Sequence, residues 1–307
     1  MDQLIARATS LSADLDLIAP TVGKIAIPLG CLYLAGQALG TVWRRFLGPL
    51  LVGEVKWKEM GSWAVVAGAS YGIGAEYARE LAKRGLNVFL IGHDEAGLKD
   101  VEMSIKQKCS VKVRTLKADF SDGMVGFNSA KEAIKDLDIG VLVNTAALDL
   151  PAGTFDMMDG GDMKRLIDVN CGTPTVMMSI VLPEMLRKRR GVIINFGSFV
   201  GEANCPNPTV YPSTKTFCHK LTRDLQVWYK DSGVIFQTVM PGVVGSPMAY
   251  DLPSSLLIPS PATYTKSLVK TVGWVDETSG YIPHDIQLAT MKVRIATLSD
   301  NISHLYL

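Results

Sequence analysis

The sequence predicts an α/β fold, in which a single doubly wound parallel sheet carries helices on both faces. From residue 63 onward, short apolar runs alternate with helix-like stretches, as in a parallel sheet with crossover helices. The apolar runs are continuous, as in WAVVA, VFLI and GVLV, so both faces of each strand are expected to be covered. At 307 residues the chain is long enough for one such domain and a short appendage.

The expected strands and helices alternate along the chain. We expect strands at 62–67, 87–91, 111–118, 139–144, 191–196 and 234–240. We expect helices at 73–85, 94–108, 124–137, 160–189 and 209–231. Residues 245–261 are rich in proline and serine and predict a loop after the sixth strand. Loops at the carboxyl ends of strands form the substrate sites of doubly wound sheets.

The balance of charge and the cysteine pattern argue against several classes of protein. The 31 lysines and arginines nearly cancel the 30 aspartates and glutamates, so no global positive field favours nucleic acid as a partner. The five cysteines are scattered and never spaced as CxxC. Neither a disulfide framework nor a metal site is therefore predicted, and a reducing compartment fits best.

The N-terminal region differs from the rest of the chain. Residues 25–43 contain no charge and are about long enough to cross a membrane as a helix, although a hairpin-like or interfacial segment stays an alternative. Basic residues that follow this run place the C-terminal side in the cytosol. We therefore expect a membrane-anchor region at 1–55, a catalytic domain at 56–290 and a C-terminal tail at 291–307.

A glycine-rich turn after the first expected strand predicts a dinucleotide site of the Rossmann type. Glycines at this point let the backbone turn tightly and approach a pyrophosphate, while the free amides of the next helix face the anion. The residues expected to bind the cofactor here are Gly68, Ser70, Tyr71, Gly72, Ile73 and Gly74.

Tyr211 and Lys215 form a candidate catalytic pair. Residues four apart on a helix share a face, so the Lys215 ammonium is expected to lie near the phenol. A nearby cation lowers the pKa of a phenol and prepares it for acid catalysis near neutral pH. Ser198 ends the fifth strand region, and its hydroxyl is a candidate to bind a substrate carbonyl oxygen.

These motifs, with their GxxxGxG spacing, resemble the short-chain dehydrogenase/reductase family over about residues 60–290. The resemblance makes Asn170 the fourth catalytic residue, holding a water of the proton relay, and implies that Lys215 also binds the cofactor ribose. It implies hydride transfer from a nicotinamide, with Tyr211 as the proton donor. It adds these cofactor-binding residues: Asp119, Asn144, Ala146, Pro241, Gly242, Val244 and Ser246.

The end of the second expected strand bears on the choice of cofactor. Gly92 stands where members of the family that prefer NAD usually carry an acid, so nothing there repels a 2′-phosphate. His93 follows it and is a candidate to contact that phosphate, with an ordinary exposed histidine in a turn as the alternative. NADPH is therefore favoured, with NADH as the alternative. Ala67, Thr145 and Ala147 depart from the family pattern.

Within the family, the anchor and the block SGY at residues 279–281 with His284 resemble the branch of very-long-chain 3-oxoacyl-CoA reductases and 17β-hydroxysteroid dehydrogenases. That resemblance implies a lipophilic substrate, an acyl-CoA or a ketosteroid, and the endoplasmic reticulum membrane, with a mitochondrial membrane as the alternative. It also implies a homodimer or a subunit of a membrane complex. The competing hypothesis is an inactive dehydrogenase-like relative that serves as a scaffold.

Overall fold

The computed structural model describes residues 24, 28–33, 35, 36, 39, 40, 43, 53–149, 154–202, 210–249 and 252–297. The chain divides into two compact units, Met1–Gly53 and Glu54–Leu307. The expected membrane segment at 25–43 lies for the most part outside the described residues. The unit Glu54–Leu307 carries the sheet.

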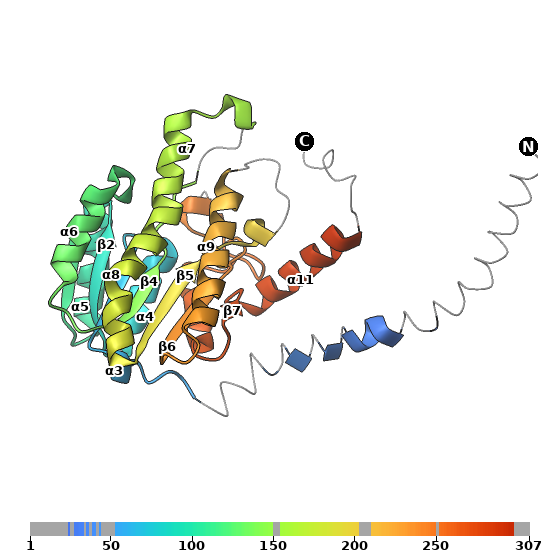
Figure 1. Ribbon diagram of the computed structural model, residues 1–307, viewed down its shortest axis with the longest axis horizontal. Coiled ribbons are helices and arrows are strands. Elements are labelled where there is room, and N and C mark those ends of the chain that lie inside the picture. The colour runs from blue at the N-terminus through green and yellow to red at the C-terminus, as the bar shows by residue number, and fades with distance from the viewer. Residues whose placement is uncertain are drawn as a thin grey trace, which may run out of the picture. The chain divides into compact units, whose positions relative to one another are not determined.

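Among the described residues, seven strands form one parallel sheet in the order β3-β2-β1-β4-β5-β6-β7 (Figure 1). The strands are β1 Trp63–Ala67, β2 Asn87–Gly92, β3 Val113–Lys117, β4 Ile139–Asn144, β5 Gly191–Phe196, β6 Val234–Val239 and β7 Glu277–Thr278. The predicted fold is confirmed, and six strands were predicted to within two residues. The strand order reverses between β1 and β4, which is where a doubly wound sheet opens a crevice at its carboxyl edge.

The helices also follow the prediction, with one interruption and three additions. They are α3 Trp57–Met60, α4 Gly72–Lys83, α5 Glu95–Lys108, α6 Met124–Ile134, α7 Gly160–Ile167, α8 Thr173–Lys188, α9 Val210–Trp228, α10 Pro261–Leu268 and α11 Ile282–Thr297. The single helix expected at 160–189 is divided by a π-helical segment, Asp168–Gly172, between α7 and α8. Helices α3, α10 and α11 were not expected, and the boundary placed at residue 290 lies inside α11.

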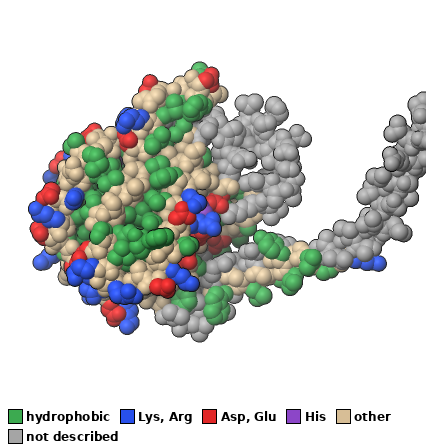
Figure 2. Space-filling model, in the orientation of Figure 1, with side chains coloured by type: hydrophobic (Ala, Val, Ile, Leu, Met, Phe, Trp, Pro, Cys, Tyr) green, Lys and Arg blue, Asp and Glu red, His purple; other side chains and the backbone are tan. Residues whose placement is uncertain are grey.

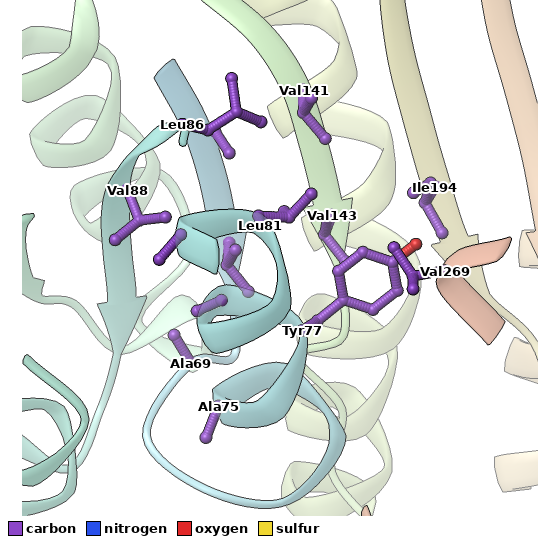
Figure 3. Close-up of a cluster of buried hydrophobic side chains, with 14 of the residues drawn as sticks. Ala69, Ala75, Tyr77, Leu81, Leu86, Val88, Val141, Val143, Ile194 and Val269 are labelled. Atoms are coloured by element: carbon purple, nitrogen blue, oxygen red, sulfur yellow. The ribbon is translucent and has the colours of Figure 1, made fainter. Parts of the chain in front are cut away.

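Two hydrophobic clusters cover the two faces of the sheet. Alternate residues of the five central strands, β2, β1, β4, β5 and β6, enter opposite clusters, as Val66 and Val65 of β1 do. In the first cluster Tyr77 and Leu81 of α4 lie beside Val143 of β4 (Figure 3). Burial of each such side chain contributes about 1.5 to 3 kcal/mol. The strands read as continuous apolar runs because both of their faces are buried in this way.

One helical stretch in the described part of the chain, Gly160–Lys188, is long and apolar enough to cross a membrane. Its apolar side chains Met177, Val181 and Met185 are buried in the second cluster. The core of the domain therefore accounts for its hydropathy. Acidic and basic side chains are interspersed on the face of the molecule seen in Figure 2, in keeping with the nearly neutral sequence.

Candidate active site

The turn between β1 and α4 packs directly on the segment that follows β4. Gly68 has a φ of +90°, and a Cβ there would lie 2.4 Å from the Ala146 nitrogen. The Thr145 hydroxyl donates hydrogen bonds to the carbonyl oxygens of Ala67 at 2.8 Å and Gly68 at 3.1 Å. Thr145, which departs from the family pattern, therefore closes this turn.

The start of α4 is suited to hold a pyrophosphate. Among the described residues no side chain caps this helix, and its first turn carries no acid. Gly72 has a φ of +61°, and a Cβ there would meet, among those residues, only the Ser246 Cβ at 3.5 Å. Free amides and the positive end of the helix dipole thus face open space, which fits the phosphates of a dinucleotide.

A cleft of about 260 Å³ runs along the carboxyl edge of the sheet. Most of the predicted cofactor residues line it: Gly68, Ser70, Tyr71, Gly72, Ile73, Gly74, His93, Asp119, Ala146, Tyr211, Lys215, Pro241 and Ser246. The glycine turn and Tyr211 therefore line the same cavity.

Three predicted cofactor residues lie outside the lining of the cleft. The buried Asn144 donates a hydrogen bond to the Asn195 side chain at 2.8 Å, which links β4 to β5. The Gly242 nitrogen donates to Nδ1 of His284 at 3.2 Å, and Val244 packs in the first hydrophobic cluster. These three residues therefore contact neighbouring parts of the fold and do not line the cleft.

The end of the cleft near β2 and β3 carries polar and charged groups. The Asp119 carboxylate accepts a hydrogen bond from the Ser121 nitrogen at 2.9 Å. Although burial opposes the change, this bond and the charges of His93 and Arg165 lower the pKa of Asp119. The Tyr71 ring meets His93 edge-on, with the centroids 6.0 Å apart. Asp119 therefore remains ionised at neutral pH and is able to accept hydrogen bonds.

Ser70 leaves no room for a side chain at position 92, so glycine is required there. A Cβ at position 92 would lie 2.2 Å from the Ser70 hydroxyl oxygen, which itself donates to the Asp94 carbonyl at 3.1 Å. An acidic side chain at this position would thus require Ser70 to move. The absence of an acid at the end of β2 is a consequence of how the glycine turn packs on that strand.

Tyr211 and Lys215 face each other on the first turns of α9. The Lys215 nitrogen lies 5.5 Å from the centre of the Tyr211 ring and donates to the Phe196 carbonyl at 3.3 Å. Burial lowers the pKa of Lys215 below its ordinary value, although the nearby Cys218, Cys171 and Asp149 oppose the change. The lysine is therefore a buried amine placed between β5 and the phenol.

The prediction that the pKa of Tyr211 is lowered was wrong, because the pKa is raised. Burial raises the pKa of Tyr211 and Asp149 raises it further, while a hydrogen bond with the Ser198 hydroxyl lowers it. Burial removes water from around the phenolate and raises the pKa by more than the Ser198 hydrogen bond lowers it. Tyr211 is consequently a neutral phenol in contact with Ser198, and its proton is available for donation.

Asn170 lies in the π-helical segment and joins two parts of the site. Its side-chain oxygen accepts from the Leu148 nitrogen at 2.7 Å, and its nitrogen donates to the Leu148 carbonyl and the Thr214 hydroxyl, both at 3.0 Å. These bonds fix the loop after β4 against α9. The side chain thus positions the catalytic loop, and the water-holding role implied by the resemblance stays a prediction.

Arg165 is a cleft residue that the sequence reasoning missed. It lines the cleft from α7 beside Asp119, and its ion pair with Asp162 is long at 3.4 Å. It belongs to none of the motifs that carry the resemblance, so no signal in the sequence identified it. Met248 and Phe120 also line the cleft without having been predicted.

Comparison with known proteins assigns the class of this fold and site. The family model described as short chain dehydrogenase matches residues 62–256, and the chain belongs to this family of oxidoreductases, which use nicotinamide dinucleotides. The chain is 37% identical over 244 residues to the very-long-chain 3-oxoacyl-CoA reductase of Rattus norvegicus, covering 78% of this chain and 75% of that protein. It is 34% identical over 276 residues to the very-long-chain 3-oxooacyl-coA reductase let-767 of Caenorhabditis elegans, covering 85% of each.

Solved structures share the fold. A structure reported for 7β-hydroxysteroid dehydrogenase has a TM-score of 0.70 at 22% identity, covering 77% of this chain and 94% of that one. A short-chain dehydrogenase from Sphingobium yanoikuyae in complex with NADPH has a TM-score of 0.64 at 22% identity, covering 78% and 96%. At these identities the likeness supports the fold of the domain and no finer assignment.

Proposed function

We propose that this protein reduces the 3-keto group of a long-chain 3-oxoacyl-CoA to a 3-hydroxyacyl-CoA with NADPH. The observation that carries the proposal is the neutral Tyr211 phenol, hydrogen-bonded to Ser198 and facing Lys215, in the same cleft as the glycine turn. The names of the similar reductases support the acyl-CoA class of substrate. A ketosteroid is the alternative ketone.

The bound dinucleotide supplies the hydride, and the side chains of the chain manage the proton. Ser198 orients the carbonyl oxygen while Tyr211 donates its proton to that oxygen. The buried Lys215 amine, once protonated, stabilises the phenolate that remains. Because burial raises the pKa of Tyr211, the phenol stays protonated across the physiological range. That state favours reduction, since oxidation of an alcohol would need the tyrosinate first.

We place this reaction at the endoplasmic reticulum membrane, with the unit Glu54–Leu307 in the cytosol. The uncharged run at 25–43 supports attachment to a membrane, and an acyl-CoA with a long chain partitions to the same surface. A homodimer or a subunit of a membrane complex is the proposed assembly.

The substrate assignment is tested by turnover of NADPH with three ketones in parallel. Full-length protein in detergent is mixed with a long-chain 3-oxoacyl-CoA, a 17-ketosteroid and a simple ketone, and the loss of NADPH absorbance is followed. We expect the highest kcat/KM with the 3-oxoacyl-CoA. A higher value with the steroid would overturn the assignment of substrate but keep the reductase.

A second candidate function, a non-catalytic scaffold, is favoured by one observation. Ala67, Thr145 and Ala147, all on the cofactor side of the site, depart from the family pattern, which suits a relative that has lost catalysis. Calorimetric titration with NADPH separates the two functions when combined with the turnover measurement. Absence of NADPH binding, together with no reduction of any of the three ketones, would support the scaffold.

Arg165 offers a prediction about the cofactor. Replacement of Arg165 by glutamine is expected to weaken NADPH binding by about two- to fivefold, because an exposed cation beside the cleft is lost. The measurement is the Kd for NADPH from quenching of its fluorescence. Lys164→Gln is the matched control, since Lys164 is tied to Asp168 and lies outside the lining. Equal Kd values for both variants would contradict a role for Arg165.

A further inference from the structure

A buried histidine lies on the same helix as the catalytic pair, outside the cleft. His219 follows Lys215 by one turn of α9 and is 9% exposed. Its Nδ1 lies 2.6 Å from a carboxylate oxygen of Glu202. Its buried Nε2 lies 3.2 Å from an oxygen of Glu277, within ion-pair distance but without the alignment of a hydrogen bond. Arg223, one turn further along α9, contacts the same Glu277 oxygen at 3.0 Å.

The first of these carboxylates belongs to the segment that carries Ser198. Glu202 is the last residue of the 3-10 helix η5, Phe199–Glu202, which begins directly after Ser198. The Thr216 hydroxyl of α9 donates to the Gly201 carbonyl at 2.7 Å and makes a second link between the same elements. His219 and Thr216 thus attach the Ser198 segment to the helix that presents Tyr211.

The second carboxylate comes from the edge of the sheet. Glu277 lies in β7, which pairs with β6, and the segment after β6 contributes Pro241 to the cleft. The Phe199 nitrogen donates to the Pro241 carbonyl at 3.1 Å. His219 is therefore the point at which three elements around the cleft meet: η5, α9 and β7.

Two carboxylates beside one buried imidazole favour the charged form of His219. A neutral imidazole has one N–H and can serve one carboxylate, whereas the imidazolium donates from both nitrogens. The contact with Glu277 raises the pKa of His219 most, burial opposes the rise, and Glu202 adds to it. Of the charged groups that face the ring, Glu202 and Glu277 attract its proton, while Arg223 is occupied with Glu277.

We propose that the His219 imidazolium is a positioning residue that holds the Ser198 segment against the Tyr211 helix by bridging Glu202 and Glu277. This role rests on the proposed function, because its consequence is the alignment of Ser198 with Tyr211. The folded-state pKa lies above the ordinary value, so the bridge is complete below about pH 6.5 and is lost as the pH rises through the raised pKa. The reductase is thus most active when His219 is charged.

Activity measurements test the consequence of the bridge. In the full-length protein, His219→Gln is expected to lower kcat by about tenfold at neutral pH, because a misplacement of the Ser198 segment costs rate. The KM for NADPH is expected to stay within twofold of the parent, since the glycine turn is untouched. In the parent, kcat is expected to fall on the alkaline side with a midpoint that Glu202→Gln moves to lower pH. A purely structural histidine would not produce that shift.

Lys220→Gln is the matched control, because Lys220 is the next residue of α9, is exposed and pairs with Asp224. It is expected to keep the parental kcat and pH profile. An unchanged kcat in His219→Gln, or an alkaline limb that Glu202→Gln leaves in place, would overturn the positioning role.

Hydrogen exchange separates this proposal from the proposed function. The amides of Phe199 and Gly201 are bonded within and around η5, to Pro241 and Ser198. Their exchange is expected to be faster in His219→Gln than in the parent at about pH 7, after correction for intrinsic rates, and the same in Lys220→Gln. If the parent reduces no ketone but shows this difference, the proposed function fails and the bridge stands. If exchange is the same in all three proteins, the bridge itself is overturned.

Discussion

Replacement of Tyr211 by phenylalanine is expected to lower kcat for ketone reduction by about 10² to 10⁴-fold, the usual contribution of a general acid. The hydroxyl is the group that meets Ser198, and phenylalanine removes it while keeping the ring near the Lys215 ammonium. Affinity for NADPH is expected to change by less than about threefold, because the glycine turn and Lys215 remain. Steady-state oxidation of NADPH and calorimetric titration measure the two quantities on the same sample.

The matched control for this substitution is Tyr229→Phe. Tyr229 follows the end of α9 and stacks on Phe236 in the second cluster, with ring centroids 6.0 Å apart. Its replacement removes a hydroxyl away from the cleft and is expected to leave kcat unchanged. Parental turnover in Tyr211→Phe would refute Tyr211 as the proton donor and would point to another acid in the cleft.

The pH dependence distinguishes Tyr211 from His219. Because burial raises the pKa of Tyr211, its ionisation is not expected to limit reduction between about pH 6 and about pH 9. A fall of kcat within that range is instead attributed to loss of the His219 bridge. Only the latter responds to Glu202→Gln, so the two causes can be assigned from one set of profiles.

The sequence predicted the strands well because their two buried faces leave a continuous apolar run. Val65 and Val66 point to opposite clusters, so consecutive positions of β1 are both apolar. The strand β7 escaped prediction because it has two residues, Glu277 and Thr278, and exists only by pairing with β6. For α10 a signal was present, since Ser260 accepts a hydrogen bond from the Thr263 nitrogen and Pro261 opens the helix.

The break at Asp168–Gly172 could not be read from the sequence. The apolar positions on either side continue with helical spacing, so they predict one helix. What selects the π-helical turn lies elsewhere in the chain, because Asn170 there binds Leu148 and Thr214. Such segments often mark functional sites, and here the break serves the loop beside the cleft.

Some features of the candidate site likewise follow from neighbouring residues in the sequence, whereas others depend on residues far apart in the chain. The glycine turn and the Tyr211 and Lys215 spacing are local features, and the structure brings their residues into one cleft. The direction of the Tyr211 pKa depends on burial by several elements and on Asp149, which no local pattern contains. The contact of His219 with Glu202 and Glu277 likewise exists only after η5, α9 and β7 have packed together.

Gly74→Ala is expected to produce the largest loss of stability among the substitutions considered. A Cβ at this position would lie 2.0 Å from the Gly68 carbonyl oxygen and 2.5 Å from the Thr145 hydroxyl. Neither neighbour is the free end of a flexible side chain, because the Thr145 hydroxyl is bonded to Gly68 and Ala67. We expect the free energy of unfolding to fall by about 3 kcal/mol, at the upper end of overpacking, as measured by urea denaturation.

NADPH binding is expected to be lost together with stability, because the clash can be relieved only by moving the turn that faces the pyrophosphate. The matched control is Gly160→Ala at the first residue of α7, where nothing among the described residues lies within 4 Å of the added Cβ. That variant is expected to unfold within about 0.5 kcal/mol of the parent and to bind NADPH normally. A Gly74→Ala protein with parental stability and affinity would contradict the close packing of α4 on the β1 turn, on which the whole cofactor half of the site depends.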